Sequence, residues 1–226
     1  MNAVVYYSNS NESYKIAQYL SDKSTYQLID VRKNDIIQFD NLILVFPVYC
    51  QNIPYEVKEF VKYIKVNNIS LIATYGKKSF GNVIYEISKE NNNLNIISYA
   101  YVPTKHTYID NDFSFNDFDK LKPLVEKFNN PKSVVIKKYN KNPFANIMML
   151  KRSQNNIKII KTQLCNECGL CNKICSNIDK GYTNNKCIRC LRCVNSCPAK
   201  ALKINKSFFL GIYLRVINKN KLIIKV

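Results

Sequence analysis

Cysteine spacing is the first sign of chemistry in this sequence. Eight of the nine cysteines form two runs of the type Cys-x2-Cys-x2-Cys-x3-Cys. The runs are Cys165, Cys168, Cys171 and Cys175, and then Cys187, Cys190, Cys193 and Cys197, the last followed by Pro198. Three thiolates two residues apart can bind three irons of one cubane, whose fourth iron then needs a cysteine from elsewhere. We therefore expect two [4Fe–4S] clusters that exchange their last cysteines, so that Cys197 completes the first set and Cys175 the second.

Zinc is the main alternative for these cysteines. Structural zinc sites usually take two separated Cys-x-x-Cys pairs, with four ligands per metal. Here each run has three closely spaced cysteines and a fourth, and the pattern occurs twice. Disulfides fit less well, because a Cys-x-x-Cys step closes only a small loop. Ser176 replaces the proline that usually follows the first run, which changes a turn and removes no ligand. The pattern favours iron–sulfur ligation and one-electron chemistry.

The polar loop over residues 8–13 is a second candidate site. It follows a strand-like segment and precedes a helix-like one, and it contains the hydroxyls of Ser8, Ser10 and Ser13. Hydroxyls, backbone N–H groups and a helix N-terminus together can bind an anion such as a phosphate. The alternative is a polar loop in which Ser13 caps the helix. The loop has no glycine, so it is not the Gly-x-Gly-x-x-Gly fingerprint of dinucleotide binding.

Strand-like and helix-like segments alternate before the cysteines. Apolar runs at 3–7, 26–31, 42–46, 70–74 and 96–102 predict five strands, and helical periodicity lies near 14–20, 54–64, 81–89 and 118–128. This alternation predicts an α/β fold with a doubly wound, parallel, five-stranded sheet. The loops 8–13, 47–53 and 74–81 all follow strands. Because such sheets bind ligands at the carboxyl ends of their strands, we expect all three loops to reach one ligand.

The domain organisation follows from these patterns. We expect a first domain over 1–130, a basic connector over 131–160 with an apolar patch at 147–150, a cysteine domain over 161–205, and a tail over 206–226. The tail alternates apolar and basic residues, which fits an added edge strand.

The loops and cysteine runs together resemble one family, the flavodoxin-domain/ferredoxin fusion proteins of anaerobes. In the phosphate loop of flavodoxins, hydroxyls stand where this chain has Ser8, Ser10 and Ser13, whereas Asn11 replaces a glycine and Glu12 an asparagine. Asparagine tolerates the left-handed backbone that glycine adopts there. The segments 46–54 and 74–76 resemble the loops that flank the flavin.

The resemblance implies a flavodoxin-like fold, a small α+β bacterial 2x[4Fe-4S] ferredoxin domain, FMN as ligand, and electron transfer. Tyr49 and Tyr75 would stack on the flavin ring. The implied flavin-site residues are Ser8, Ser10, Asn11, Ser13, Pro47, Tyr49, Thr74, Tyr75 and Gly76. The lone Cys50 and the only histidine, His106, receive no role.

Charge and composition restrict the classes of binding partner and the compartment that we expect. The formal net charge of +18 falls to about +14 if each cluster with its four thiolates carries about −2. Such a charge fits an acidic redox partner, a membrane surface or nucleic acid, and the alternative is a composition rich in Lys, Asn and Ile throughout the chain. No apolar run approaches the roughly 20 residues of a membrane span, and no charged segment precedes the first strand as in a signal peptide, so we expect a cytoplasmic protein. No motif for specific nucleic-acid binding is present.

Two functions remain open from the sequence. The first is an electron carrier that passes electrons between FMN, two [4Fe–4S] clusters and a redox partner. The second is a flavin-dependent oxidoreductase, or a subunit of one, that acts on a small substrate. No nicotinamide fingerprint supports a self-sufficient reductase.

Overall fold

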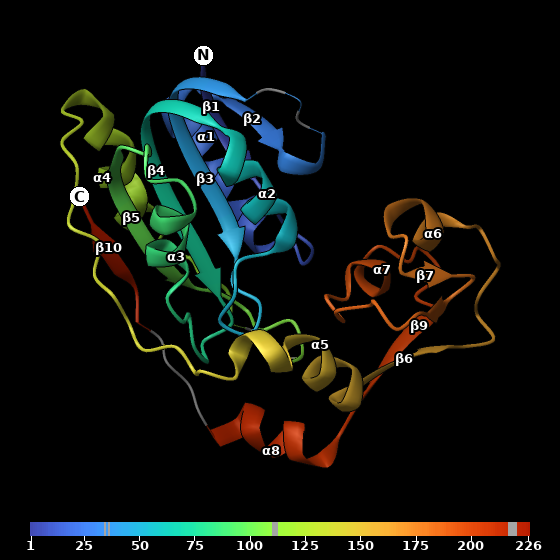
Figure 1. The fold of residues 1–226 in the computed structure, drawn as a ribbon. Helices are drawn as coiled ribbons and strands as arrows, with labels where there is room; N and C mark the ends of the chain where they lie inside the picture. The colour runs from blue at the N-terminus through green and yellow to red at the C-terminus, as the bar shows by residue number, and fades with distance from the viewer. Residues whose placement is uncertain (34, 36, 110–112, 217–220) are drawn as a thin grey trace. The chain divides into compact units, whose positions relative to one another are not determined.

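A computed structural model describes residues 1–33, 35, 37–109, 113–216 and 221–226, without the side chains of 147–152 and 216. The chain forms two compact units (Figure 1). The first comprises Met1–Asn142 and Lys219–Val226, and the second comprises Pro143–Asn218. The second unit is therefore inserted, in sequence, before the last segment of the first.

The first unit is built on a six-stranded sheet of order β10-β5-β4-β3-β1-β2. Its strands are β1 (Asn2–Tyr6), β2 (Gln27–Asp30), β3 (Gln38–Pro47), β4 (Lys65–Tyr75), β5 (Ile96–Pro103) and β10 (Ile223–Lys225). The five predicted strands are present, parallel, in the order 2-1-3-4-5 that flavodoxin-like sheets have. The predicted strand count of five was too low, because β10 pairs antiparallel with β5, Ile223 opposite Tyr101.

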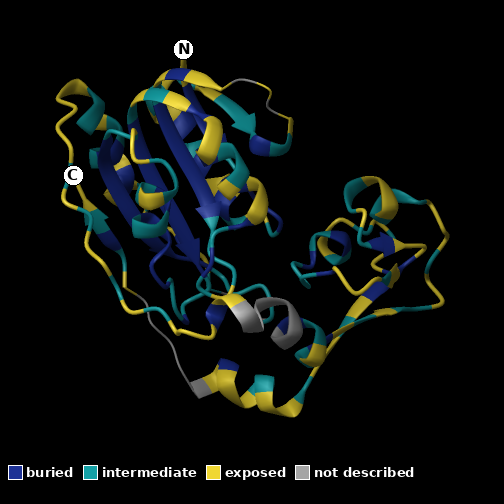
Figure 2. Ribbon diagram, viewed as in Figure 1, coloured by how far each residue is buried: buried dark blue, intermediate teal, exposed yellow. Residues whose placement is uncertain are grey.

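Helices cover both faces of this sheet, as the doubly wound prediction requires. They are α1 (Glu12–Ser24), α2 (Tyr55–Tyr63), α3 (Val83–Glu90) and α4 (Lys122–Glu126), with 3₁₀ turns at Val31–Lys33, Phe118–Leu121 and Lys127–Asn129. One buried cluster joins α2 and α3 to the sheet, and another joins α1 and α4 to it. All residues of β5 are buried, and Figure 2 shows the central strands of the sheet mostly in dark blue. Burial on both faces explains why the strands are continuously apolar rather than alternating.

Tyr75 fixes the returning segment to the sheet. Its side chain is 1% exposed, and its hydroxyl donates to the Lys221 carbonyl at 2.7 Å and accepts from the Lys221 N–H at 3.1 Å. Burial raises the pKa of Tyr75 to about 12, so the hydroxyl keeps its proton at neutral pH.

We expect Tyr75→Phe to loosen β10 without unfolding the sheet. The variant leaves two backbone groups of Lys221 without this partner, which costs about 1 kcal/mol. Amide exchange at residues 221–225 should accelerate severalfold, as read by hydrogen-exchange mass spectrometry. Tyr63→Phe, at a tyrosine that is 66% exposed on α2, is the matched control and should change nothing. Unaltered amide exchange at residues 221–225 in Tyr75→Phe would contradict the claim that the Tyr75 hydroxyl holds this segment to the sheet.

The second unit contains short elements around the cysteines. They are α5 (Ala145–Asn156), β6 (Ile157–Lys161), α6 (Leu170–Ile174), β7 (Ile178–Asp179), β8 (Tyr182–Thr183), α7 (Arg192–Asn195), β9 (Leu202–Lys206) and α8 (Phe208–Val216). Strands β6 and β9 pair antiparallel, and β7 and β8 form a tight hairpin through Lys180 and Gly181, both at positive φ. The small hydrophobic core of the second unit contains Ile178, Cys193 and Leu202.

The compact units differ from the domain limits expected from sequence. Residues 157–160, expected in the connector, belong to β6 and pair with β9 of the cysteine unit. The apolar patch at 147–150 falls within α5, but its side chains lie outside the described ones. The tail divides, because α8 belongs to the second unit and β10 to the first. The limits 1–130, 131–160, 161–205 and 206–226 stay predictions for functional domains.

Candidate iron–sulfur and flavin sites

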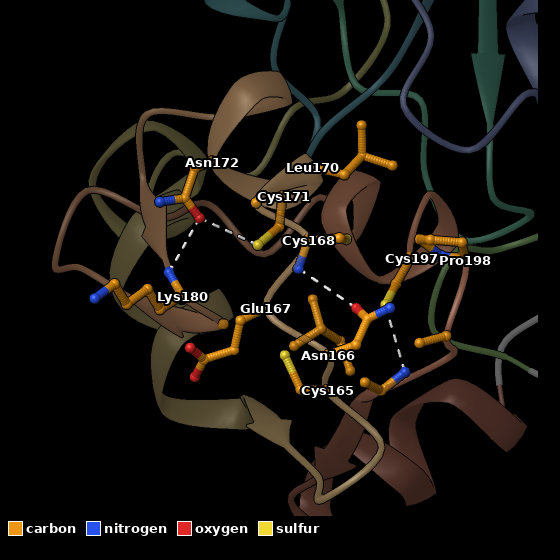
Figure 3. A pocket seen from close by; sticks show the side chains of 15 residues that line it. Cys165, Asn166, Glu167, Cys168, Leu170, Cys171, Asn172, Lys180, Cys197 and Pro198 are labelled. Carbon is orange, nitrogen blue, oxygen red and sulfur yellow. Dashed lines mark hydrogen bonds between the residues drawn. The ribbon is translucent and has the colours of Figure 1, made fainter.

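Four cysteines from both runs line one cavity of the second unit. The cavity, of about 160 Å³, is lined by Cys165, Cys168, Cys171 and Cys197, among other residues (Figure 3). The first three lie just before or within α6, whereas Cys197 follows α7. The fold thus brings the last cysteine of the second run to the first three of the first run. This is the grouping expected if the runs exchange their fourth ligands.

The other four cysteines also lie near one another. Burial, together with the neighbouring Cys190, Cys187 and Cys175, raises the pKa of the Cys193 thiol to about 12. Cys175 therefore lies close enough to the second run to act on it electrostatically. A thiol with so high a pKa becomes a thiolate at neutral pH only beside a cation such as iron. This set therefore fits a buried metal group.

Residues in the left-handed backbone conformation explain how each cysteine run can curve around a cluster. In the first run Glu167 and Gly169, with φ of 55° and 72°, flank the second cysteine. In the second run Arg189 and Leu191, with φ of 58° and 62°, occupy the equivalent places. Gly169 and Leu191 then begin α6 and α7. A left-handed leucine is unfavourable by about 1–2 kcal/mol, which the burial of Leu191 offsets.

The fourth cysteine of each run accepts a backbone hydrogen bond at its sulfur. Asn177 N–H donates to Cys175 Sγ, and Ala201 N–H donates to Cys197 Sγ, both at 3.4 Å. Such bonds stabilise thiolate charge and orient the ligand. In the described part of the chain, no three His, Cys, Asp or Glu side chains converge tightly enough to hold a single metal ion. A cubane does not need that convergence, because each of its four irons takes its own thiolate.

In the first unit, the three predicted loops meet at the carboxyl ends of the strands. The Ser13 hydroxyl lies 2.8 Å from the Thr74 hydroxyl, and Val48 N–H donates to the Thr74 carbonyl at 2.8 Å. Asn9 Nδ2 donates to the Tyr49 hydroxyl at 2.9 Å. Each loop therefore contacts the other two, and all three can reach one ligand.

The loop over residues 8–13 has features of a phosphate site. Ser8 is 7% exposed, and its buried Oγ has no hydrogen-bond partner in the structure. Asn11 adopts φ 65°, the left-handed conformation expected where it replaces glycine. Glu12 opens α1 and pairs with Lys15 at 3.1 Å, which offsets part of its charge. The prediction that Ser13 caps α1 was wrong, because Asn11 occupies that position and Ser13 is inside the helix.

The loops that would flank a flavin ring are closed by tight turns. Cys50 and Gln51 have φ of 49° and 67°, between Tyr49 and Asn52, whose backbones bond to each other at 2.9 and 3.0 Å. A Cβ on Gly81 would lie 2.7 Å from the Gln51 carbonyl oxygen, so these two loops touch there.

Two flavin-site expectations have different outcomes in these loops. Tyr49 is half-buried and stays a candidate to stack on a ring. Tyr75 cannot stack, because its side chain is buried in the core and bonded to Lys221. Gly76 faces His106, whose Cδ2 would lie 2.7 Å from an added Cβ. His106, which received no role from the sequence, therefore packs closely against the loop at Gly76.

A charged network beside Ser8 was not predicted. Arg32 makes two bonds to the carboxylate of Asp30, at 2.8 and 2.6 Å, and donates to Asn9 Oδ1 and to the Ser8 carbonyl, both at 3.1 Å. Although burial lowers the pKa of Arg32, the bonds with Asp30 raise it overall, so the guanidinium stays charged. The signal was available in the sequence, because Asp30 ends β2, the neighbour of β1 at the ligand-binding edge, and Arg32 follows it in a 3₁₀ turn.

Among the described residues, none of the helices has the length and apolar character to span a bilayer.

Comparison with known families matches one segment. Residues 182–203 fit Fer4, the 4Fe-4S binding domain, and this segment contains the second cysteine run. Among curated proteins, none matches the chain.

Solved structures similar to the chain include three proteins. The first is a short-chain flavodoxin associated with a non-canonical PDU bacterial microcompartment, 12% identical over 56% of this chain and 94% of that one, with a TM-score of 0.41. The second, described as a flavoprotein of Bacteroides uniformis ATCC 8492, is 11% identical over 46% and 91%, with a TM-score of 0.39. The third is the Trp repressor binding protein of Bacillus subtilis, 13% identical over 56% and 93%, with a TM-score of 0.36. Similarity at this level says nothing about a ligand of this chain.

The strand order of the first unit and the Fer4 match at residues 182–203 together define the two parts of the chain. The chain joins a flavodoxin-like α/β unit to an iron–sulfur-binding segment of the ferredoxin type.

Proposed function

We propose that this chain is an electron-transfer protein with two [4Fe–4S] clusters in its second unit and FMN in its first, serving an acidic redox partner. The observation that carries the proposal is the grouping of the cysteines. Cys165, Cys168 and Cys171 share a cavity with Cys197, whereas Cys175 lies near Cys187, Cys190 and Cys193. When bound, FMN supplies conversion between electron pairs and single electrons, and each cluster supplies a one-electron centre.

The cysteine unit would hold each cluster through thiolates and shield it from water. Cys187 and Cys193 are buried, whereas Cys168 is exposed. The first set is therefore more accessible to solvent, and we propose that it is the side that exchanges electrons with the partner. The acidic character of that partner follows from the composition of the second unit, which has thirteen Lys and Arg and two Asp and Glu.

The first unit would bind FMN at the edge where its three loops meet. Ser8 Oγ is the strongest support, because a buried hydroxyl without a partner is unfavourable unless a ligand completes it. Ser10, the left-handed Asn11 and the start of α1 would complete the phosphate site, and Arg32 lies behind the loop with its positive charge. Pro47, Tyr49, Thr74 and Gly76 would flank the ring.

Metal and flavin analysis tests the proposal directly. Anaerobically reconstituted protein should contain about eight irons and eight sulfides per chain. Stoichiometric zinc, or iron for a single cluster, would overturn it. Reduction of the bound flavin by a small substrate, without a protein partner, would favour the alternative of a flavin-dependent oxidoreductase.

FMN affinity should depend on the 8–13 loop. Titration with the protein should quench FMN fluorescence, and Ser8→Ala and Ser10→Ala should each weaken binding about tenfold, because each removes a bond to a charged phosphate. Glu12→Asn should strengthen binding severalfold, since it removes a negative charge and leaves Lys15 beside the loop.

Ser24→Ala is the matched control for these variants. Its hydroxyl bonds to the Leu20 carbonyl at the far end of α1, so FMN affinity should not change. If neither wild type nor Glu12→Asn binds FMN at high micromolar concentration, the first unit is a flavodoxin-like scaffold without its cofactor.

A further inference from the structure

Helix α8 exposes an apolar face to solvent. Phe208 and Phe209 are 78% and 80% exposed, and Ile212 and Tyr213 are each 45% exposed. At 3.6 residues per turn these four side chains lie on one side of the helix, whereas Leu214 on the other side is buried. Figure 2 shows much of α8 in the colour of exposed residues. A surface helix normally turns its polar side outward, so this face marks an interaction site.

The helix is a fixed element rather than a frayed end. The Ser207 hydroxyl accepts from Leu210 N–H at 3.3 Å, as a helix N-cap does, and bonds to Asn156 Oδ1 at 2.5 Å. Ser207 N–H also donates to the Asn156 carbonyl at 2.9 Å. The start of α8 is therefore tied to the end of α5, and its orientation within the second unit is set.

The sequence of the second unit before and within this helix is basic. From Lys180 to Val216 it has five lysines, three arginines and no Asp or Glu. Lys203 and Lys206 are exposed on β9 just before the helix, and Arg215 is exposed within it. A negatively charged surface that accepts apolar groups would complement this arrangement.

We propose that α8 binds the surface of an anionic phospholipid bilayer, lying in the plane of the membrane. Phe208, Phe209 and Ile212 would enter the boundary between head groups and acyl chains, and the lysines would contact the phosphates. The acidic redox partner proposed above would approach the cysteines, whereas this face presents exposed aromatic side chains beside lysines, which the surface of an anionic bilayer can accommodate together. The nine-residue helix is about 13 Å long, which is too short to span. This inference does not depend on FMN or on the number of clusters.

Vesicle co-sedimentation of the full chain tests the proposal. The chain should sediment with phosphatidylcholine vesicles that contain about 30% phosphatidylserine, and at least about tenfold less with phosphatidylcholine alone. Phe208→Ser with Phe209→Ser should lower partitioning at least about tenfold, because it removes two buried aromatic side chains. Lys203→Gln and Lys206→Gln should each lower it about fivefold, and salt should weaken it.

The control removes two exposed aromatic residues elsewhere. Tyr55→Ser with Tyr63→Ser, at residues 73% and 66% exposed on α2, should leave partitioning unchanged. The proposal is overturned if wild type does not bind phosphatidylserine vesicles. It is also overturned if the Phe208/Phe209 variant binds as well as wild type, since net charge would then suffice.

Two further results would assign the face to another occupant. If wild type is a dimer in sedimentation velocity, does not bind vesicles, and becomes a monomer in the same variant, the face binds a second copy of the chain. Retention on immobilised polyglutamate without vesicle binding would assign it to an acidic protein.

Discussion

Cys197→Ser should reduce the iron content from about eight to about four per chain, and the cluster lost should be the one beside Cys165 rather than the one beside Cys193. The reason is geometric, because Cys197 lines the cavity that holds Cys165, Cys168 and Cys171. Serine is a poor ligand for iron, so the cubane in that cavity loses a corner. Iron and sulfide analysis of anaerobically reconstituted protein measures the change.

Double variants identify which cluster is lost. Combining Cys197→Ser with Cys165→Ser should again leave about four irons, because both residues serve the same cluster. Combining Cys197→Ser with Cys187→Ser should leave almost none. If each run instead held its own cluster, the two results would be reversed, and the exchange of ligands would be wrong. Cys50→Ser, at an exposed cysteine of the other unit, should keep all eight irons.

Removing the clusters should unfold the second unit while the first stays folded. The described core of the second unit has few members, with Ile178, Cys193 and Leu202 buried among half-buried neighbours. The expected cysteine domain, residues 161–205, is too small to rely on its core alone, and metal ligation then supplies much of its folding free energy. Hydrogen exchange in β6 and β9 should accelerate at least about a hundredfold after oxidation and chelation.

The flavodoxin-like sheet provides the internal reference for that experiment. Amides of β3 and β4 should keep their protection, because those strands are buried in a separate core. Full protection of β6 and β9 in protein shown to lack iron would contradict the prediction. Loss of protection in both units would indicate that they unfold together.

Sequence patterns predicted the sheet well because its strands are buried on both faces. Runs such as residues 42–46 are apolar throughout, and their alternation with helices leaves few topologies. The two cysteine runs were recognisable because ligand spacing within a run is a local property, whereas the exchange of Cys175 and Cys197 between the runs stays a prediction. The sixth strand depended on a contact between Ile223 and Tyr101, far apart in the chain, which local patterns do not encode.

One site residue, Tyr75, and one helix cap, Ser13, were misjudged for reasons that the structure makes clear. The sequence ended the fourth strand at Thr74, but β4 continues to Tyr75. Since side chains alternate along a strand, that one residue places Tyr75 in the core with Leu71 and Ala73 rather than in the loop. The cap role of Ser13 was inferred from its neighbours in sequence alone, whereas its hydroxyl bonds to the Thr74 hydroxyl in β4. Arg32 was overlooked because Asn9 and the Ser8 carbonyl, unlike Asp30, lie beside it only through the pairing of β1 with β2.

The position of β10 in the sequence has a consequence for how the protein is made. During synthesis, β1 to β5 emerge first, but the strand that covers the free edge of β5 follows the whole cysteine unit. Until residues 221–225 appear, β5 presents unpaired N–H and C=O groups, and an open strand edge is a template for aggregation. The sheet of the first unit can therefore be completed only after the whole second unit has been translated.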